Sequence, residues 1–316
     1  MTTITQPRLR TRPAGLWGDA WRRLRRDPLA MVSLSVIAVY FLVAVVVAAM
    51  QTDAFQAALE TFGVKDPAAE VPLVDPMLQY EKADARPPSR HHPFGTDILG
   101  MDVLVSTLNG AKVSILIGVG VALITVTIGL AIGTIAGYNG GVIDTLIVWL
   151  YTTVASVPGI LLILSLASVL GRGYVTIYVA MSATAWVGVC RIVRGETLKH
   201  RESEYVLAAR ALGASGPRIL VRHIIPNVFH IVIIQASLLI IGAISSLVIL
   251  DYLQVGIQGQ PTWGIMITES RDQLTSRGMW WPLAAATGAM FVLILAFNFL
   301  GDGLRDALDP RLSEGG

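Results

Sequence analysis

Charge and cysteine are both scarce in this sequence of 316 residues. Asp, Glu, Lys and Arg together make up 15% of the chain, whereas hydrophobic residues make up 53%. A soluble globular protein carries charged residues at about 25% of its positions. Cys190 is the single cysteine, which excludes an intrachain disulfide and a metal site built from several cysteines. The composition therefore argues against a soluble domain.

A phosphate-binding loop is also missing. The sequence contains no GxxxxGK[ST] motif, the glycine-rich loop whose backbone amides cradle the phosphates of a nucleotide. We therefore expect that this chain binds no cofactor of its own and is not an enzyme. His91 and His92 adjoin and could suggest a metal site, but no third ligand stands at a suitable spacing, so we expect no metal there.

Long apolar runs dominate the sequence instead. Each of six runs approaches or exceeds the ~20 residues that a helix needs to cross a bilayer. The runs are Leu29–Met50, Val113–Tyr138, Thr145–Leu170, Tyr174–Cys190, Val228–Leu250 and Trp280–Leu300. An outer-membrane barrel would show alternating segments of about ten residues instead. The pattern predicts an all-α polytopic membrane protein with six transmembrane helices, the third kinked at Pro158.

These runs contain no Asp, Glu, Lys or Arg. Of Asp, Glu, Lys, Arg and His, only His230 lies within a predicted span, and Asp251 stands at the outer edge of the fifth. Transporters driven by protons or ions place ionisable residues inside the membrane, and an intramembrane enzyme needs convergent polar groups there. An ATPase-independent secondary transporter and an intramembrane enzyme are therefore the weaker alternatives.

The basic residues predict the orientation of the chain, because Lys and Arg accumulate on the cytoplasmic side of membrane helices. Most of the 24 lie in segments that would all be cytoplasmic with six spans: 1–28, 139–144, 191–227 and 301–316. Both termini are then inside. The cluster Trp21–Arg26 could suggest nucleic-acid binding, but beside a membrane anchor it favours contact with anionic lipid.

The predicted spans divide the chain into five parts. They are a cytoplasmic N-terminal segment (1–28), a first transmembrane helix (29–50), an extracytoplasmic loop (51–112), a five-helix core (113–300) that includes a cytoplasmic loop at 191–227, and a cytoplasmic tail (301–316). The run at 29–50 is too long for the apolar region of a cleaved signal peptide. We therefore expect it to be a retained anchor.

Two stripes of small or polar residues mark the spans. Gly129, Gly133 and Gly137 recur at every fourth position, which favours close helix packing within the chain over contact with another subunit. On the fifth span one helical face carries Gln235, Leu239, Gly242 and Ser246. These residues could line a translocation path, or their polar groups could bond a neighbouring helix. The sequence leaves both readings open.

The segment 191–226 is amphipathic. Val206, Ala209 and Leu212 share one helical face, and Gly213 then stops the helix. Ser215, Gly216 and Pro217 predict a turn before a second short helix, and a proline, Pro226, stands at the entrance of the fifth span. The first helix could dock a partner protein or fold back on its own spans, and physics alone does not choose between them.

The same segment resembles the EAA loop of ABC-importer permeases. The family pattern is Glu-Ala-Ala, three residues, Gly, and later a Pro. Leu207-Ala208-Ala209, Gly213 and Pro226 stand at those spacings. Leu207 occupies the usual Glu slot, and Glu204 lies one turn earlier.

Three further stretches resemble the C-type permease of oligopeptide and dipeptide importers. They are His92–Asp97 with the following Gly100 and Asp102–Leu104, Ala136–Gly141 with Asp144, and Gly301–Arg311. With the EAA-like loop, the similarity runs from about Trp17 to Arg311.

This resemblance implies a type I ABC-importer permease fold with a cytoplasmic coupling helix. Such a subunit pairs with a second permease in a heterodimer, two ABC ATPases that carry ATP and Mg, and an extracytoplasmic substrate-binding protein, and it lies in the bacterial cytoplasmic (inner) membrane. Its cargo would be oligopeptides or dipeptides, with nickel complexes, glutathione or oligosaccharides as alternatives. The implied ATPase-coupling residues are Glu204, Tyr205, Leu207, Ala208, Ala209, Arg210, Gly213 and Pro226.

Overall fold

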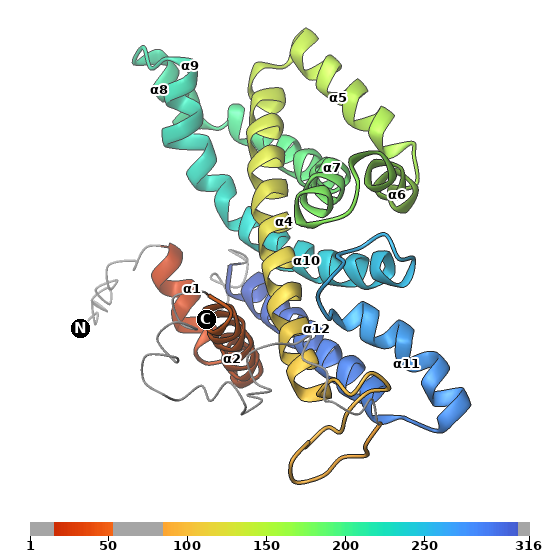
Figure 1. Cartoon of the computed structure of the whole chain (residues 1–316). Coiled ribbons are helices and arrows are strands. Elements are labelled where there is room, and N and C mark those ends of the chain that lie inside the picture. The colour runs from red at the N-terminus through yellow and green to blue at the C-terminus, as the bar shows by residue number, and fades with distance from the viewer. Residues whose placement is uncertain (1–15, 53–84, 309–316) are drawn as a thin grey trace, which may run out of the picture.

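The computed structural model describes residues 16–52 and 85–308 (Figure 1). The described chain is helical, in this order: α1 (Leu16–Leu24), α2 (Pro28–Met50), α4 (Val103–Asn139), α5 (Gly141–Ala155), α6 (Gly159–Leu170), α7 (Tyr174–Arg201), α8 (Glu204–Ala211), α9 (Gly216–Ile219), the π-helical turn η1 (Leu220–Ile224), α10 (Ile225–Tyr252), α11 (Trp263–Arg277) and α12 (Trp281–Leu308). Among the described residues, five helices are long and apolar enough to cross a membrane, and six if one bent pair counts as a span.

Several helices extend well beyond the apolar runs. The α4 helix begins at Val103, because the Asp102 carboxylate accepts the backbone N–H groups of Leu104 and Val105 and caps its first turn. Residues 103–112 of the predicted outer loop therefore belong to α4. At the other side, α7 continues to Arg201, so the first part of the predicted 191–227 loop is helix.

The third apolar run is not one straight span. It forms α5 and α6, which are bent by 85° at a short break. Pro158 stands at this break with ψ 122, outside the helical region, and it has no N–H to continue the ladder of α5. The predicted kink is confirmed, but the chain turns there much more sharply than a kinked helix.

Charged groups occur in the helices just beyond the apolar runs, which themselves carry none. Lys112 lies buried on α4, where its ammonium donates to the side-chain oxygens of Gln51 at 2.5 Å and Gln260 at 3.4 Å. Arg194 of α7 donates to both carboxylate oxygens of Asp144 on α5, at 2.5 and 2.6 Å. The apolar runs missed these groups because each stands just outside a run.

The glycine stripe of α4 packs against α7. A Cβ on Gly129 would lie 2.6 Å from Val189, one on Gly133 would lie 2.7 Å from the carbonyl of Cys190, and one on Gly137 would meet Thr197 at 2.7 Å. Real Cβ atoms do not approach that closely. The predicted use of the stripe for packing within the chain is confirmed, since the two backbones approach where side chains are missing.

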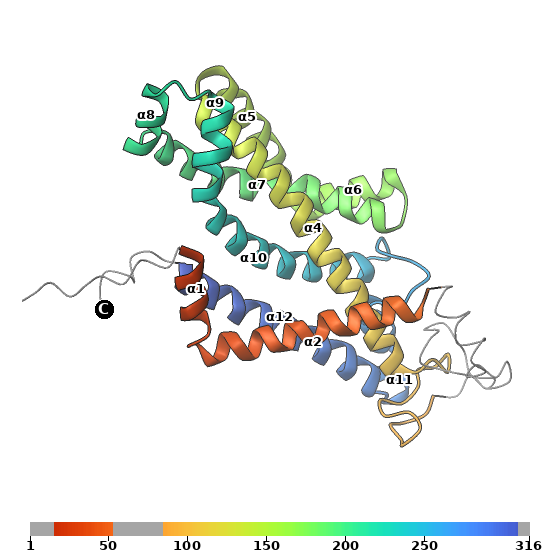
Figure 2. The ribbon, with the colours of Figure 1, turned by 90° about the vertical axis from the view of Figure 1, so that its left-hand side faces the viewer.

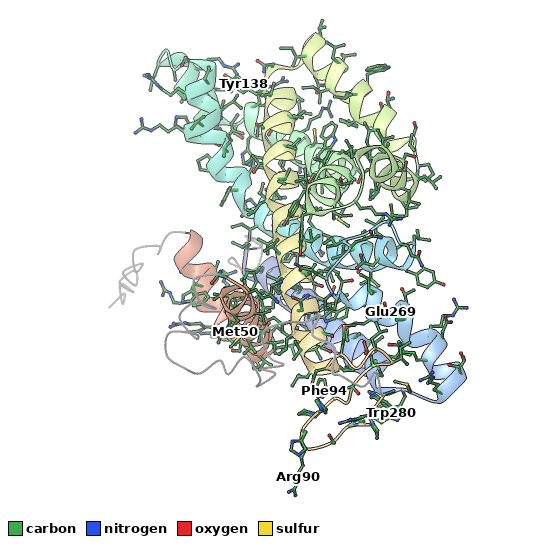
Figure 3. The ribbon with its side chains drawn as sticks, in the orientation of Figure 1. Met50, Arg90, Phe94, Tyr138, Glu269 and Trp280 are labelled. Atoms are coloured by element: carbon green, nitrogen blue, oxygen red, sulfur yellow. The ribbon has the colours of Figure 1, made fainter. Side chains whose placement is uncertain are left out.

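The two ends of the bundle differ. Figure 2 shows α1, α8, α9 and the end of α12 on one side of the molecule, and α11 with the loop at 85–102 on the other. Side chains follow the same division in Figure 3, where Tyr138 lies at one end and Arg90, Phe94 and Trp280 lie at the other. The helical part of the C-terminal segment packs on the first helices, as Gly303 faces Ala30 and Asp27. Residues 309–311 of the resembling tail lie outside the described residues.

The loop at 85–102 is tied to the spans by polar contacts. Thr96 pairs with Asp102 in an antiparallel bridge, and the Trp281 ring N–H donates to the Thr96 carbonyl at 3.1 Å. The Nδ1 atom of His92 lies 2.9 Å from the Asp102 carboxylate. This contact gives His92 a role in capping α4.

On the same side, α11 is held by a buried carboxylate. Asp251 accepts hydrogen bonds from the Thr262 hydroxyl at 2.5 Å and the Ile257 amide at 3.2 Å. Trp263, which is fully buried, donates its ring N–H to the Thr107 carbonyl at 3.0 Å. These bonds fix the start of α11 against α4 and α10.

Candidate coupling segment and translocation face

The α8 helix is a short element with defined ends. It begins after Ser203, whose backbone carbonyl accepts the N–H groups of Val206 and Leu207. It stops because Gly213 takes φ +82, a left-handed conformation that glycine adopts without steric cost. The Ala214 N–H then bonds back to the Ala209 carbonyl at 3.0 Å, which satisfies the end of the helix. The predicted stop at Gly213 is confirmed.

One face of α8 packs on the chain's own helices. Val206 is fully buried in a cluster with Val193 of α7, Ile219 of α9 and Val228 of α10, and Ala209 packs against it. Leu212, which we expected on this face, is 89% exposed. It follows the last residue of α8 and precedes the left-handed Gly213, so the helical spacing no longer places it inward.

The other face of α8 is exposed to solvent. Leu207 is 48% exposed, and the small side chains of Ala208 and Ala211 are exposed as well. Leu212, directly after the helix, is 89% exposed. Glu204 is exposed in the first turn, where a negative charge suits the helix N-terminus. Apolar and small side chains left open together allow another surface to approach closely.

A shallow cavity of about 450 Å³ adjoins this face. The Arg210 guanidinium lies over the ring of Tyr138, 5.8 Å from its centroid, at the end of α4. Leu207 and Arg210 were expected at the site, whereas the other lining residues were missed. The full lining is Tyr138, Asn139, Arg201, Glu202, Leu207 and Arg210.

Tyr205 ties α8 to the end of α7. Its hydroxyl lies 2.8 Å from Nδ1 of His200, and its ring is 6.5 Å from the ring of His223 on η1. Burial raises the pKa of Tyr205 above its ordinary value. His200 did not stand out in the sequence, because its contact with Tyr205 depends on the turn between α7 and α8.

The structure separates one predicted coupling residue from the rest. Glu204, Tyr205, Leu207, Ala208, Ala209 and Arg210 all lie on α8, and Gly213 ends the turn that follows it. Pro226 is the second residue of α10 and is exposed there. It lies beyond α9 and η1, which form a continuous helical path with α10 from Gly216 to Tyr252.

The stripe predicted for translocation lies along α10. Gln235, Leu239 and Ser246 are half-buried, and Gly242 is exposed with nothing within 4 Å of a Cβ built on it. The stripe is thus partly open along its length. Its role in translocation remains a prediction.

Comparison with known proteins identifies the family of the chain. Residues 129–314 match the family described as the binding-protein-dependent transport system inner membrane component. The chain belongs to this family. Residues 15–58 match the N-terminal transmembrane domain of oligopeptide transport permease C, so this inner membrane component is of the C type, as the resemblance implied.

Relatives with assigned functions align with almost the whole of this chain. The dipeptide transport system permease protein DppC of Bacillus subtilis is 37% identical over 298 residues, 93% of this chain and 85% of the relative. The oligopeptide transport system permease protein OppC of the same organism is 36% identical, over 94% of this chain and 90% of the relative. OppC of Escherichia coli is 32% identical, over 94% and 91%.

These matches and the helices agree on the class of protein. The chain is an all-α polytopic membrane protein with the type I ABC permease fold, and it belongs to a transport family whose members are permease components without a catalytic site of their own. Such components work in a complex with others.

Proposed function

We propose that this chain is the C-type permease subunit of an ATP-driven importer of dipeptides and oligopeptides, and that it forms half of the translocation pathway. The names of its relatives, which are dipeptide and oligopeptide permeases, support the cargo. The bare outer face of α8 is the observation that carries the coupling role, because a helix with exposed Leu207 beside small residues needs a partner surface.

The partners in this proposal are a second permease, two ABC ATPases that hold ATP and Mg, and an extracytoplasmic binding protein. The chain itself binds no nucleotide. When ATP closes the ATPase pair, α8 moves with it as a rigid body. Because Val206 locks α8 onto α9 and the helical path from Gly216 is unbroken to Tyr252, the displacement reaches α10 and its stripe at Gln235 and Ser246.

The π-helical turn η1 lies within that path. A π turn holds one extra residue per turn and is common at functional sites. We propose that it lets α10 adjust its rotation while α9 stays attached to α8. Gln235, Leu239, Gly242 and Ser246 would then face the pathway in one state and a neighbouring helix in the other.

The orientation follows from the same proposal. The chain lies in the bacterial cytoplasmic membrane with both termini and α8 inside, and with α11 and the loop at 85–102 outside. The basic cluster Trp21–Arg26, which lies at the end of α1 and just before α2, supports this placement. The binding protein then approaches the end that carries α11.

The complete complex, reconstituted in proteoliposomes with the binding protein, tests the proposal. We expect dipeptides and oligopeptides to stimulate ATP hydrolysis and to accumulate inside, whereas nickel complexes, glutathione and oligosaccharides do neither. A complex without this chain is the control and should show no stimulation. If no peptide stimulates hydrolysis while one of the other ligands does, the peptide assignment is wrong and the importer assignment stands.

A further inference from the structure

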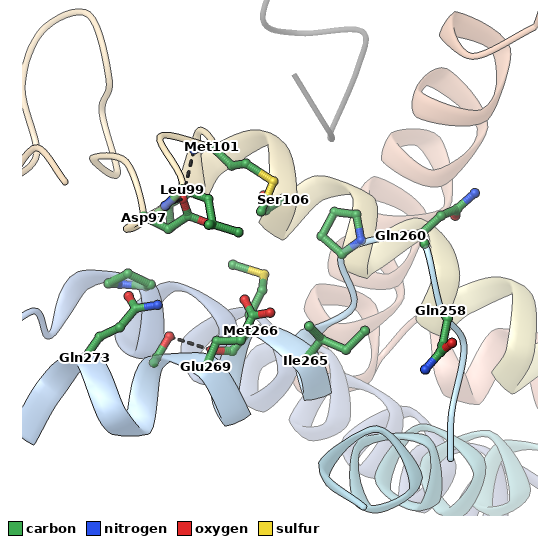
Figure 4. A pocket seen from close by; sticks show the side chains of 15 residues that line it. Asp97, Leu99, Met101, Ser106, Gln258, Gln260, Ile265, Met266, Glu269 and Gln273 are labelled. Carbon is green, nitrogen blue, oxygen red and sulfur yellow. Dashed lines mark hydrogen bonds between the residues drawn. The ribbon is translucent and has the colours of Figure 1, made fainter. Parts of the chain in front are cut away.

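A cavity of about 390 Å³ lies at the end of the molecule opposite α8. It is formed by the loop at 97–101, the start of α4, the segment before α11 and α11 itself (Figure 4). This volume lies in the range of small-ligand pockets. The cavity shares no residue with the coupling segment or with the stripe on α10.

Two carboxylates line this cavity. Asp97 is held in place by the backbone N–H groups of Leu99 and Met101, both at 2.8 Å and both on Oδ1. Glu269 projects from α11. Burial raises the pKa of Glu269, and the negative charge of Asp97 raises it further, while burial also raises the pKa of Asp97. Both carboxylates are thus destabilised as anions, and a cation between them would relieve this.

The side chain of Gln273 also lines the cavity, and its amide oxygen has no hydrogen-bond partner among the described residues. Gln273 is only 5% exposed. Figure 4 shows the side chains of Glu269 and Gln273 rising from α11 toward the loop that holds Asp97. A buried acceptor left unpaired costs free energy, so this oxygen is suited to a donor that a ligand brings.

Two further amides, those of Gln258 and Gln260, line the cavity on the side away from Asp97 (Figure 4). Oε1 of Gln260, which also lines the cavity, accepts from the Tyr174 hydroxyl at 2.9 Å and from the Lys112 ammonium at 3.4 Å. Asp97, Glu269 and Gln273 lie together on the other side of the cavity from Gln258 and Gln260 (Figure 4).

The other walls are apolar. Met101 and Leu99 lie on one side of the cavity, and Met266 and Ile265 lie on the other. A metal ion would be bound by a shell of oxygens, whereas these walls offer flexible thioether and aliphatic contacts. The cavity thus suits a donor-rich cation that is attached to an apolar group.

We propose that this cavity binds a primary ammonium group on an apolar stem. Under the proposed function, on which this assignment of the source rests, the free amino terminus of a peptide supplies that group as the binding protein releases it. Glu269 and Asp97 offset the positive charge, and Gln273 accepts one of the ammonium hydrogens.

The test uses the assembled complex of both permeases and both ATPases in nanodiscs, without nucleotide and without binding protein. Saturation-transfer difference NMR measures the affinity of phenylalanyl-alanine, its N-acetylated form and phenethylamine. We expect phenethylamine to compete with the dipeptide, and acetylation to weaken binding about tenfold or more, since a charge-assisted hydrogen bond is lost. Equal binding of the acetylated dipeptide, or no competition by phenethylamine, would overturn the proposal.

Matched variants on α11 locate the site. Glu269→Gln should weaken dipeptide binding by a similar factor, whereas Asp272→Asn, which removes the same charge from an exposed position outside the cavity, should leave it unchanged. If Glu269→Gln weakens docking of the peptide-free binding protein but not dipeptide binding, the cavity takes a lysine of that protein and the proposal is wrong. Because these assays need no ATP hydrolysis, they can fail while the wild-type importer still transports peptides.

Discussion

Gly213 holds a backbone conformation that few other residues adopt. Its φ is +82, and a Cβ built on it would meet nothing within 4 Å. The cost of a side chain there comes from the backbone alone, about 1–2 kcal/mol. We expect Gly213→Ala to leave membrane insertion intact and to lower peptide-stimulated ATP hydrolysis several-fold, because the end of α8 turns differently.

Gly195→Ala provides the control for this change, since Gly195 lies within α7 and also has open space around it. There the added methyl should stabilise the helix slightly. Hydrolysis and uptake are measured in the same proteoliposomes. Equal coupling by the two variants would show that the left-handed turn after α8 is not needed.

Leu207 and Val206 are neighbours with opposite surroundings. Leu207 is 48% exposed, whereas Val206 is 0% exposed. Leu207→Glu, which introduces the residue usual in the EAA pattern, should retain transport because the carboxylate stays in water or meets the ATPase. Val206→Glu should abolish coupling, since it buries an unpaired charge in the contact that joins α8 to α9 and α10.

Co-purification of the ATPases with each variant, together with the uptake rate, measures this difference. Both variants add the same charge at adjacent positions, so each is the control of the other. Loss of ATPase binding in Leu207→Glu with binding retained in Val206→Glu would reverse our assignment of the two faces.

At the scale of elements, the α4–α7 contact depends on the absence of side chains. A methyl on Gly133 would lie 2.7 Å from the carbonyl of Cys190, whereas Gly188 of α7 has nothing within 4 Å. Gly133→Ala should therefore destabilise the bundle by about 1–3 kcal/mol, as overpacking does. Gly188→Ala should not.

The midpoint of thermal unfolding of the purified subunit in detergent measures this effect. A clear fall for Gly133→Ala and an unchanged midpoint for Gly188→Ala are the expected results. If both variants unfold at the wild-type midpoint, α4 and α7 do not approach as closely as the structure indicates.

Elements also show where sequence reasoning succeeded and where it failed. The spacing of the three glycines predicted close packing correctly, because a repeat of four residues lies on one helical face. The apolar run did not reveal where α4 begins, because the helix starts at the Asp102 cap and not where hydrophobicity begins. The prediction that Leu212 lies on the packed face of α8 was wrong, since helical periodicity holds only as far as the helix continues.

At the scale of the whole molecule, the proposed orientation can be tested directly. Cys190 is buried, so the wild-type protein should resist a membrane-impermeant maleimide and serves as the control. Leu212→Cys, at a position 89% exposed, should react only after the cells are opened. Arg90→Cys, on the opposite end of the molecule, should react in intact cells. The reverse pattern would place α8 outside and contradict the coupling role.

The amino-acid sequence alone was sufficient to predict an all-α membrane protein, the class of permease and the helix that Gly213 ends. Apolar runs and glycine positions act locally along the chain, so a linear pattern reveals them. Tertiary structure was needed to show how sharply the chain bends between α5 and α6, that Lys112 is buried and that one face of α8 is exposed.

The cavity at Asp97 and Glu269 also became visible only in the folded chain. These residues are far apart in the sequence, and Gln273 carries no sequence signal of its own. They meet because the Asp102 cap and the Asp251 bonds hold the loop at 85–102 and α11 against the same end of the bundle. Burial and convergence of polar groups arise from packing, which no local pattern encodes.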